Sequence, residues 1–209
     1  MLERLTSFWR RRRVATVEEL RELLTAEATY LSQKTTIDYC RARAGLAWPK
    51  LVSEPQFTAA LDACRWQAMA AVLADMIVVT EGFLRPHLGT DAPRLMPALA
   101  STLFAEVLES SPAPDAARAD WRGLPDELAA RLARAQMAAV HHPGEIARTS
   151  GARVFDLLPL HPSVRIDDQE TVINSVRFGM VAFSDTLGRA VEDPAGLARR
   201  LIAGVPPRP

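Results

Sequence analysis

The chain has 209 residues, and its 25 basic and 25 acidic side chains give a formal net charge of zero at pH 7. This balance argues against a surface built throughout to bind a polyanion, so we expect no nucleic-acid partner. Cys40 and Cys64 are the only cysteines and lie far apart, which argues against a disulfide framework and a zinc site. These features favour a single cytoplasmic domain that folds without cross-links.

Residues 1–14 are predicted to form a basic amphipathic arm. Its apolar side chains directly precede a run of arginines: Leu2, Leu5, Phe8 and Trp9, then Arg10, Arg11, Arg12 and Arg13. Five arginines against one glutamate give the first 13 residues a net charge of +4, which leaves −4 for the rest. Aromatic rings beside guanidinium groups suit a membrane interface. We therefore expect the arm to dock on a membrane surface or a protein partner. A solvated tail and a mitochondrial presequence are the alternatives.

The most apolar stretch of the chain, residues 68–79, is interrupted by Asp75 and is well short of the roughly 20 residues that cross a bilayer. We therefore expect no transmembrane helix. A secretory signal does not fit either, because the early apolar residues precede the arginines instead of following them. These observations predict a cytoplasmic protein, with attachment to a membrane surface as an extension of that prediction.

Two long helices are predicted in the first half of the chain. Thr16 and Glu19 have the spacing of a capping box, and apolar residues at helical spacing extend this helix over residues 16–45. After a Trp-Pro break, Ser53 is the predicted cap of a second helix over residues 53–84. Because this second helix is apolar beyond one narrow stripe, we expect it at the centre of the domain.

The second half contains further helical patterns, over residues 95–110, 125–142, 167–191 and 193–204. The segment 111–123 is rich in Pro, Ala and charge, so we expect an exposed, flexible connection there. Residues 144–162 give a weaker signal and are predicted to be irregular. Asp167 and Glu170 have the spacing of an acidic capping box for the helix that follows. Gly179, in the middle of that helix, predicts the close approach of another helix.

These patterns together predict an all-α chain. We expect a single-domain helical bundle or orthogonal array of six to seven helices over residues 15–204. The basic arm, residues 1–14, precedes this domain, and a Pro-rich tail, residues 205–209, follows it.

Asp75 stands out because an unpaired carboxylate inside an apolar helix would be costly to bury. We expect it to be paired or hydrated, and Arg177 is a plausible partner across the core. The alternative is functional. Asp75, Glu81, Asn174 and Arg177 would then be the polar lining of an apolar internal pocket, in which a carboxylate of raised pKa could act as an acid or base.

The histidines do not form a recognisable metal motif. Glu-x-x-His pairs and His-Glu-x-x-His are absent, and His87, His142 and His161 lie beside prolines or near helix ends. Such histidines more often cap backbone carbonyls or face solvent, so we predict neither a metal nor another cofactor. A histidine cluster formed by converging loops is the alternative. The chain also lacks the common glycine-rich nucleotide motifs and the Gly-x-Ser-x-Gly elbow.

Two hypotheses for function follow. In the first, the chain is a non-enzymatic helical interaction module, such as an adaptor, a chaperone-like factor or an assembly factor. It would use an apolar groove or its basic arm to bind a protein or a membrane, or would pair with a second copy as a homodimer. In the second, it is a small-molecule-binding or enzymatic bundle with an apolar pocket polarised by Asp75, Glu81 and Arg177. Its five methionines near apolar stripes would suit such a pocket.

Overall fold

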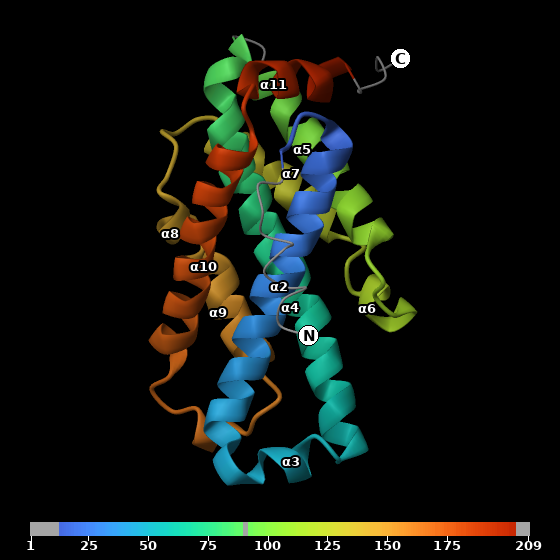
Figure 1. Ribbon diagram of the computed structural model, residues 1–209, viewed down its shortest axis with the longest axis vertical. Coiled ribbons are helices and arrows are strands. Elements are labelled where there is room, and N and C mark those ends of the chain that lie inside the picture. The colour runs from blue at the N-terminus through green and yellow to red at the C-terminus, as the bar shows by residue number, and fades with distance from the viewer. Residues whose placement is uncertain (1–12, 90–91, 204–209) are drawn as a thin grey trace.

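The computed structural model describes residues 13–89 and 92–203, so the tail at 205–209 and all but the last two residues of the arm lie outside it. Every regular element in these ranges is helical, which confirms the predicted all-α class (Figure 1). Seven helices have ten or more residues: α2 (Val17–Ala44), α4 (Pro55–Leu84), α5 (Ala92–Ser110), α7 (Leu124–Ala135), α9 (Arg148–Leu157), α10 (Gln169–Ala190) and α11 (Pro194–Ala203). Three are shorter: α3 (Trp48–Leu51), α6 (Asp115–Ala119) and α8 (Pro143–Ile146).

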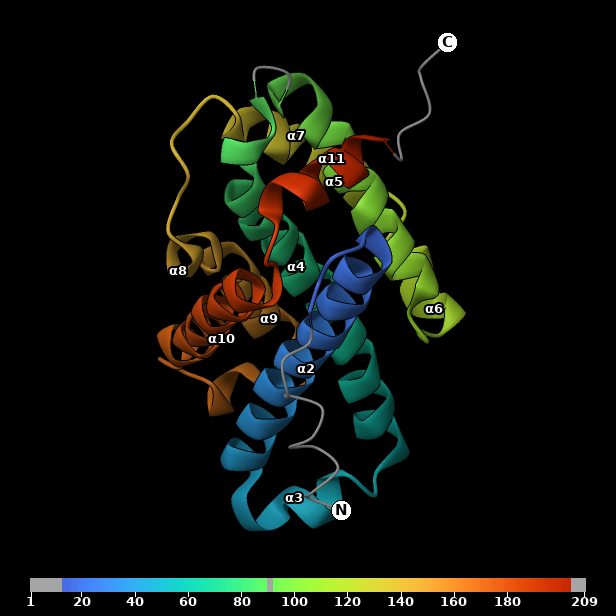
Figure 2. The same cartoon turned by 45° about the horizontal axis from the view of Figure 1, so that its top comes forward.

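Helix α4 lies at the centre of the fold, as its broad apolar surface predicts. It contacts α2, α5, α9 and α10, and the two ribbon views show these helices arranged around it (Figures 1 and 2). Its core residues include Val72, Leu73 and Met76, each at most 1% exposed. Burial of such side chains supplies most of the driving force for folding.

By length and composition, the helical stretch Pro55–His87 could also cross a membrane. The prediction from sequence considered only the most apolar run, residues 68–79, and so missed this possibility. In the structure, however, 78% of its most apolar window is buried inside the bundle. The core helices of soluble proteins pass the same test, so length and composition alone are weak grounds for a membrane span.

Helix α2 confirms two predictions made from local patterns. The Thr16 hydroxyl accepts a hydrogen bond from the backbone N–H of Glu19 at 3.2 Å, and the Glu19 carboxylate accepts one from the N–H of Thr16 at 2.9 Å, which completes the capping box. The close approach at Gly179 of α10 is to α2. A Cβ atom at Gly179 would lie 2.2 Å from a methyl carbon of Leu31, so no larger residue fits without movement.

Two other predicted caps are wrong. Helix α4 begins at Pro55, and the Ser53 hydroxyl donates backwards to the carbonyl of Pro49 at 2.6 Å. Helix α10 has Asp168, not Asp167, at its cap position, without a side-chain cap. The Asp168 carboxylate instead forms an ion pair with Arg43 and accepts a hydrogen bond from Tyr39, both on α2. A charged tertiary partner therefore outcompetes the local cap.

Two segments differ from their sequence expectations. The predicted exposed connection, residues 111–123, contains α6 and buries Ala113, Ala117 and Trp121 in the core. The segment predicted to be irregular contains α8 and α9, while α7 ends at Ala135, earlier than expected. Helix α9 is difficult to recognise from sequence because it is short and contains Gly151. That glycine fits its position, since a Cβ there would lie 2.9 Å from the backbone of Ile173 on α10.

Candidate functional site

Asp75 lies where three helices meet. Its side chain is fully buried on α4, and its Oδ1 atom is 2.5 Å from a terminal guanidinium nitrogen of Arg131 on α7. Its Oδ2 atom accepts a hydrogen bond of 3.0 Å from the backbone N–H of Ser150, in the first turn of α9. That N–H has no acceptor within its own helix, so the carboxylate satisfies the start of α9 as a cap would. Asp75 is therefore paired, but with Arg131 and not with Arg177.

The pairing of Asp75 is incomplete. Although Oδ1 is close to Arg131, it accepts no hydrogen bond of acceptable geometry from any described residue. Burial raises the pKa of the Asp75 carboxyl, and the charge of Arg131 and the hydrogen bond from Ser150 offset only part of that effect. Asp75 thus has one ion pair and one backbone hydrogen bond, fewer partners than a carboxylate can accept.

A pocket of about 950 Å³, here called the Asp75 pocket, opens between α4, α7 and α9. Its main apolar lining residues are Ala70, Ala71, Ala74, Leu124, Leu128 and Leu157. Its charged lining residues are Asp75, Asp120, Glu127, Arg131, Arg134 and Arg153. An apolar concavity with a few converging polar groups is the usual form of a small-molecule site.

The pocket exists because of the side chains that α4 presents on this face. Where the opposite side of α4 carries larger residues such as Met69 and Met76, this side carries Ala70, Ala71 and Ala74. Three alanines within two helical turns leave space that leucines would fill. Helix α7 packs mainly against α5, whereas α9 packs against both α10 and α4, so the two side walls come from different parts of the fold.

The structure separates the four polar residues predicted to share one pocket. Glu81 lies six positions after Asp75 on α4, and at 100° per residue it points to a different side of the helix. Its carboxylate is 1% exposed and accepts two hydrogen bonds from Arg85, of 2.7 and 2.8 Å, and one of 2.6 Å from Gln136. Arg85 also donates to the carbonyls of Ala135 and Ala138, so this cluster holds the end of α7 on α4.

Asn174 and Arg177 lie together on α10, away from the Asp75 pocket. The Arg177 guanidinium donates to the Asn174 side-chain oxygen at 3.0 Å and to the backbone carbonyl of Gly144 at 3.0 Å. Gly144 belongs to α8, so these two residues fasten α8 to α10. Of the four predicted residues, only Asp75 lines the pocket.

Sequence reasoning missed the three arginines of the pocket. Arg131 and Arg134 lie one turn apart on the polar face of α7, where charged residues normally face solvent, and Arg153 has the same character on α9. One signal was present in the sequence. A buried carboxylate such as Asp75 requires a cation nearby, and the segments that form α7 and α9 are among those that carry arginines.

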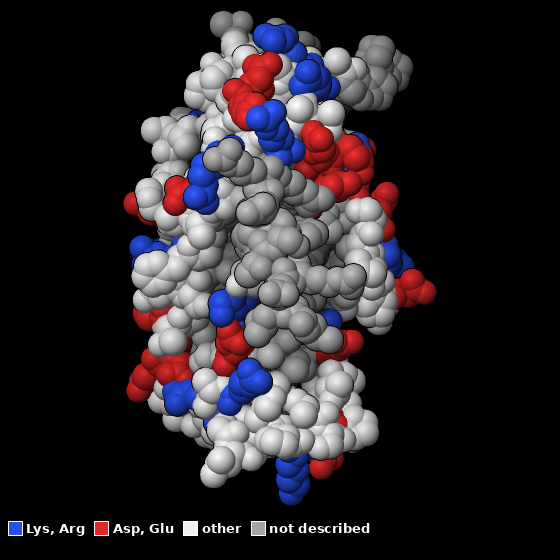
Figure 3. Space-filling view, in the orientation of Figure 1, with Lys and Arg blue, Asp and Glu red and all other residues white. Residues whose placement is uncertain are grey.

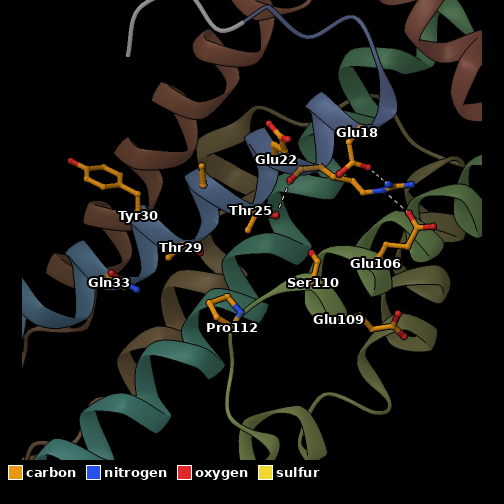
Figure 4. Close-up of a pocket in the computed structure, with 12 residues that line it drawn as sticks. Glu18, Glu22, Thr25, Thr29, Tyr30, Gln33, Glu106, Glu109, Ser110 and Pro112 are labelled. Carbon is orange, nitrogen blue, oxygen red and sulfur yellow. Dashed lines mark hydrogen bonds and ion pairs between the residues drawn. The ribbon is translucent and has the colours of Figure 1, made fainter. Parts of the chain in front are cut away.

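A second concavity, a groove of about 1020 Å³, runs along α2 beside the end of α5 (Figure 4). Its charged residues are mainly acidic: Glu18, Glu22, Glu106 and Glu109, with Arg21. The Arg21 guanidinium forms ion pairs with Glu18 and Glu106 across the groove. Acidic side chains also gather over the start of α2 and neighbouring α5 in the space-filling view (Figure 3). The groove contains no fully buried polar group comparable to Asp75.

The histidines act locally. Nδ1 of His142 accepts a hydrogen bond from the N–H of Gly144 at 3.1 Å, and Nδ1 of His161 accepts one from the N–H of Ser163 at 3.3 Å. Each therefore caps the start of the helical turn that follows it by accepting from an N–H group, and not by capping carbonyls as expected. Over residues 13–89 and 92–203, no three His, Cys, Asp or Glu side chains come together in a group that could hold a metal.

Most of the predicted basic arm, including Trp9, Arg10, Arg11 and Arg12, lies outside the described residues. Arg13 is described, and its exposed side chain forms an ion pair of 3.1 Å with Glu192. Val14 belongs to the core, because it is 2% exposed and its N–H donates to the carbonyl of Ala190 at 2.9 Å. The folded domain therefore begins one or two residues before the boundary expected from the sequence.

Comparison of the chain with protein-family models, with curated proteins and with solved structures gave no match. The argument for function therefore rests on the geometry of the described residues.

Proposed function

We propose that this chain binds a small amphipathic molecule in the Asp75 pocket. The observation that carries the proposal is a fully buried carboxylate, held by one ion pair and one backbone hydrogen bond, beside an apolar concavity. A protein that used Asp75 only to join helices would be more stable with the adjacent space filled. The open alanine face of α4 is instead what a ligand would need.

Binding, and not acid–base catalysis, is the role that the arrangement supports. Arg131 lies over Asp75 and forms its ion pair, so the carboxylate has no free path to a substrate proton in this conformation. The alanines, leucines and guanidinium groups around it would provide an apolar contact surface and a polar end.

The test is to fill the pocket. Ala74 is half-buried and lines the pocket, so Ala74→Leu should place an isobutyl group in the cavity without lowering helix propensity. With the neutral apolar dye Nile red as the probe, we expect its fluorescence enhancement by the wild-type protein to fall at least tenfold in the variant. The free energy of unfolding should stay within about 1 kcal/mol of the wild-type value.

Ala63→Leu is the matched control, because Ala63 is exposed on the same helix and does not line the pocket. It should bind the dye as the wild type does. Native mass spectrometry of protein from its own host should show a bound small molecule in the wild type and Ala63→Leu only. Equal dye binding by all three proteins would refute the proposal.

We also propose, as a second candidate, that residues 1–14 attach the domain to a membrane. The supporting observation is that Arg13 is exposed, with 77% of its side chain accessible, so the arm joins the domain at the surface. Removal of residues 1–12 keeps Val14 in place and should abolish sedimentation with phosphatidylglycerol vesicles while leaving Tm unchanged. Undiminished sedimentation would show that the arm is not the attachment.

A further inference from the structure

The charges of the Asp75 pocket differ between its two ends. Gln67 and Asp75 are eight positions apart on α4, which corresponds to about 12 Å along the helix axis. At the first end, the Gln67 amide donates to the Asp120 carboxylate at 2.6 Å. At the second end, Asp75 forms its ion pair with Arg131, and Arg134 follows one turn later on α7. The alanine floor lies between these two ends.

Two of the three guanidinium groups have no counter-charge of their own. Arg131 is paired with Asp75, whereas Arg134 and Arg153 form no ion pair with any residue that the structure describes. Both are exposed at the rim, Arg134 on α7 and Arg153 on α9. Neither side chain would have to leave a protein partner in order to bind a ligand.

The acidic residues of the lining do not cancel this effect. Asp120 is engaged by Gln67 at the far end of the pocket. Glu127 lies seven positions before Arg134 on α7, about 10 Å away along the axis, so it lies toward the Asp120 end. Arg134 and Arg153 each lie one helical turn beyond a residue that contacts Asp75, Arg131 on α7 and Ser150 on α9, so they flank the neutralised ion pair.

We propose that the ligand of the Asp75 pocket is an amphipathic anion whose acid group lies between Arg134 and Arg153. Its apolar part lies along Ala70, Ala71 and Ala74 toward the Asp120 end of the pocket. This inference rests on the proposed binding function and adds the class of ligand. Guanidinium groups suit this role because they remain charged and bind carboxylates and phosphates through paired hydrogen bonds.

The probes that test the proposal differ only in the head group. Decanoate, decyl phosphate and decyltrimethylammonium carry the same ten-carbon chain, and isothermal titration calorimetry gives their affinities. We expect decanoate and decyl phosphate to bind at least tenfold more tightly than the cation. A preference between the two anions would indicate whether the natural head group is a carboxylate or a phosphate ester. Equal binding of the cation would overturn the proposal.

Replacing the two arginines tests their role directly. In a double variant, Arg134→Gln with Arg153→Gln, decanoate affinity should fall at least tenfold, because the acid group loses its charge-assisted hydrogen bonds to both guanidinium groups. Nile red carries no charge, so its binding should not change. Arg148→Gln is the matched control, since Arg148 lies on α9 outside the pocket and pairs with Glu170.

The outcomes distinguish a failure of the acid-group assignment from a failure of the proposed binding function. If Ala74→Leu abolishes decanoate binding but the double arginine variant retains it, the pocket binds and the acid-group assignment is wrong. If Ala74→Leu has no effect on either probe, the proposed function itself fails. Loss of decanoate binding in the double variant, with Nile red binding intact, would support both.

Discussion

Asp75 and Glu81 lie on the same helix and are buried to the same extent, yet their surroundings differ. Glu81 accepts three hydrogen bonds, two from Arg85 and one from Gln136. Asp75 accepts one, from Ser150, and its other oxygen has an ion pair without a hydrogen bond of acceptable geometry. Glu81 adjoins packed side chains, whereas Asp75 adjoins a pocket of about 950 Å³.

This comparison shows that burial of a charge does not identify a functional group. The cost of burying a carboxylate is offset by its partners, and a fully satisfied carboxylate has nothing left to offer a ligand. Glu81 has the properties of a structural cluster that holds two helices together. Asp75 combines incomplete satisfaction with open space, and this combination distinguishes a candidate binding site.

The largest expected effect comes from removing Arg85. Arg85→Met would leave Glu81 buried without its cation and two carbonyls near the end of α7 without their donor, so we expect a loss of about 3–5 kcal/mol in urea unfolding. Arg148→Met is the control. Its ion pair with Glu170 is exposed on both sides and should contribute less than about 0.5 kcal/mol.

Removing the cation of the other carboxylate should cost less. In Arg131→Met, Asp75 keeps the N–H of Ser150, and its carboxyl can take up a proton or meet water in the pocket. We expect a loss of about 1–2 kcal/mol in the same urea experiment. A loss equal to that of Arg85→Met would show that Asp75 is as structural as Glu81, and the contrast between them would disappear.

Part of this contrast could be predicted from sequence. An aspartate within an apolar helix must be paired or hydrated, and that argument needs no structure. The identity of its partner could not be predicted, because α7 carries its arginines on a polar face that resembles any solvated surface. Only the position of α7 relative to α4 distinguishes Arg131 from the other cations, and local patterns do not contain that position.

Local sequence patterns do not contain the relative positions of helices, and this explains which other predictions were right and which were wrong. Thr16 with Glu19 is a local interaction, so its spacing predicted the structure. Gly179 predicted that a helix approaches closely, but not that Leu31 of α2 is the neighbour. Asp168 was missed as the cap residue because its carboxylate binds Arg43, which is 125 positions away in the chain. Contacts between distant segments decided these features, and sequence patterns do not contain them.

A substitution at Gly151 tests how precisely α9 must sit beside Asp75. A Cβ atom there would meet the backbone of Ile173 at 2.9 Å, and backbone atoms cannot move aside cheaply. We expect Gly151→Ala to shift α9, weaken the hydrogen bond from Ser150 to Asp75, and cost about 1–2 kcal/mol in thermal unfolding. Gly188→Ala is the control on α10, where nothing lies within 4 Å, and it should gain up to about 1 kcal/mol.

The smallest expected effect is a difference in the pH dependence of stability. Burial raises the folded pKa of Asp75, so its contribution to stability is complete below the unfolded pKa of about 3.9 and is lost as pH rises through the folded value. Hydrogen bonds from Arg43 and Tyr39 lower the folded pKa of Asp168, whose contribution is therefore present above about pH 3.9 and is lost as pH falls through the folded value.

Urea unfolding between pH 3 and pH 8 would measure both slopes, with Asp75→Asn and Asp168→Asn each compared with the wild type. As pH rises from about 4, the wild type should lose stability relative to Asp75→Asn, because ionised Asp75 is buried without full compensation. As pH falls below about 4, it should lose stability relative to Asp168→Asn. If the stability of the wild type relative to the variant rose with pH for both Asp75→Asn and Asp168→Asn, Asp75 would be as well satisfied as a surface ion pair. The contrast between Asp75 and the fully satisfied Glu81 would then fail.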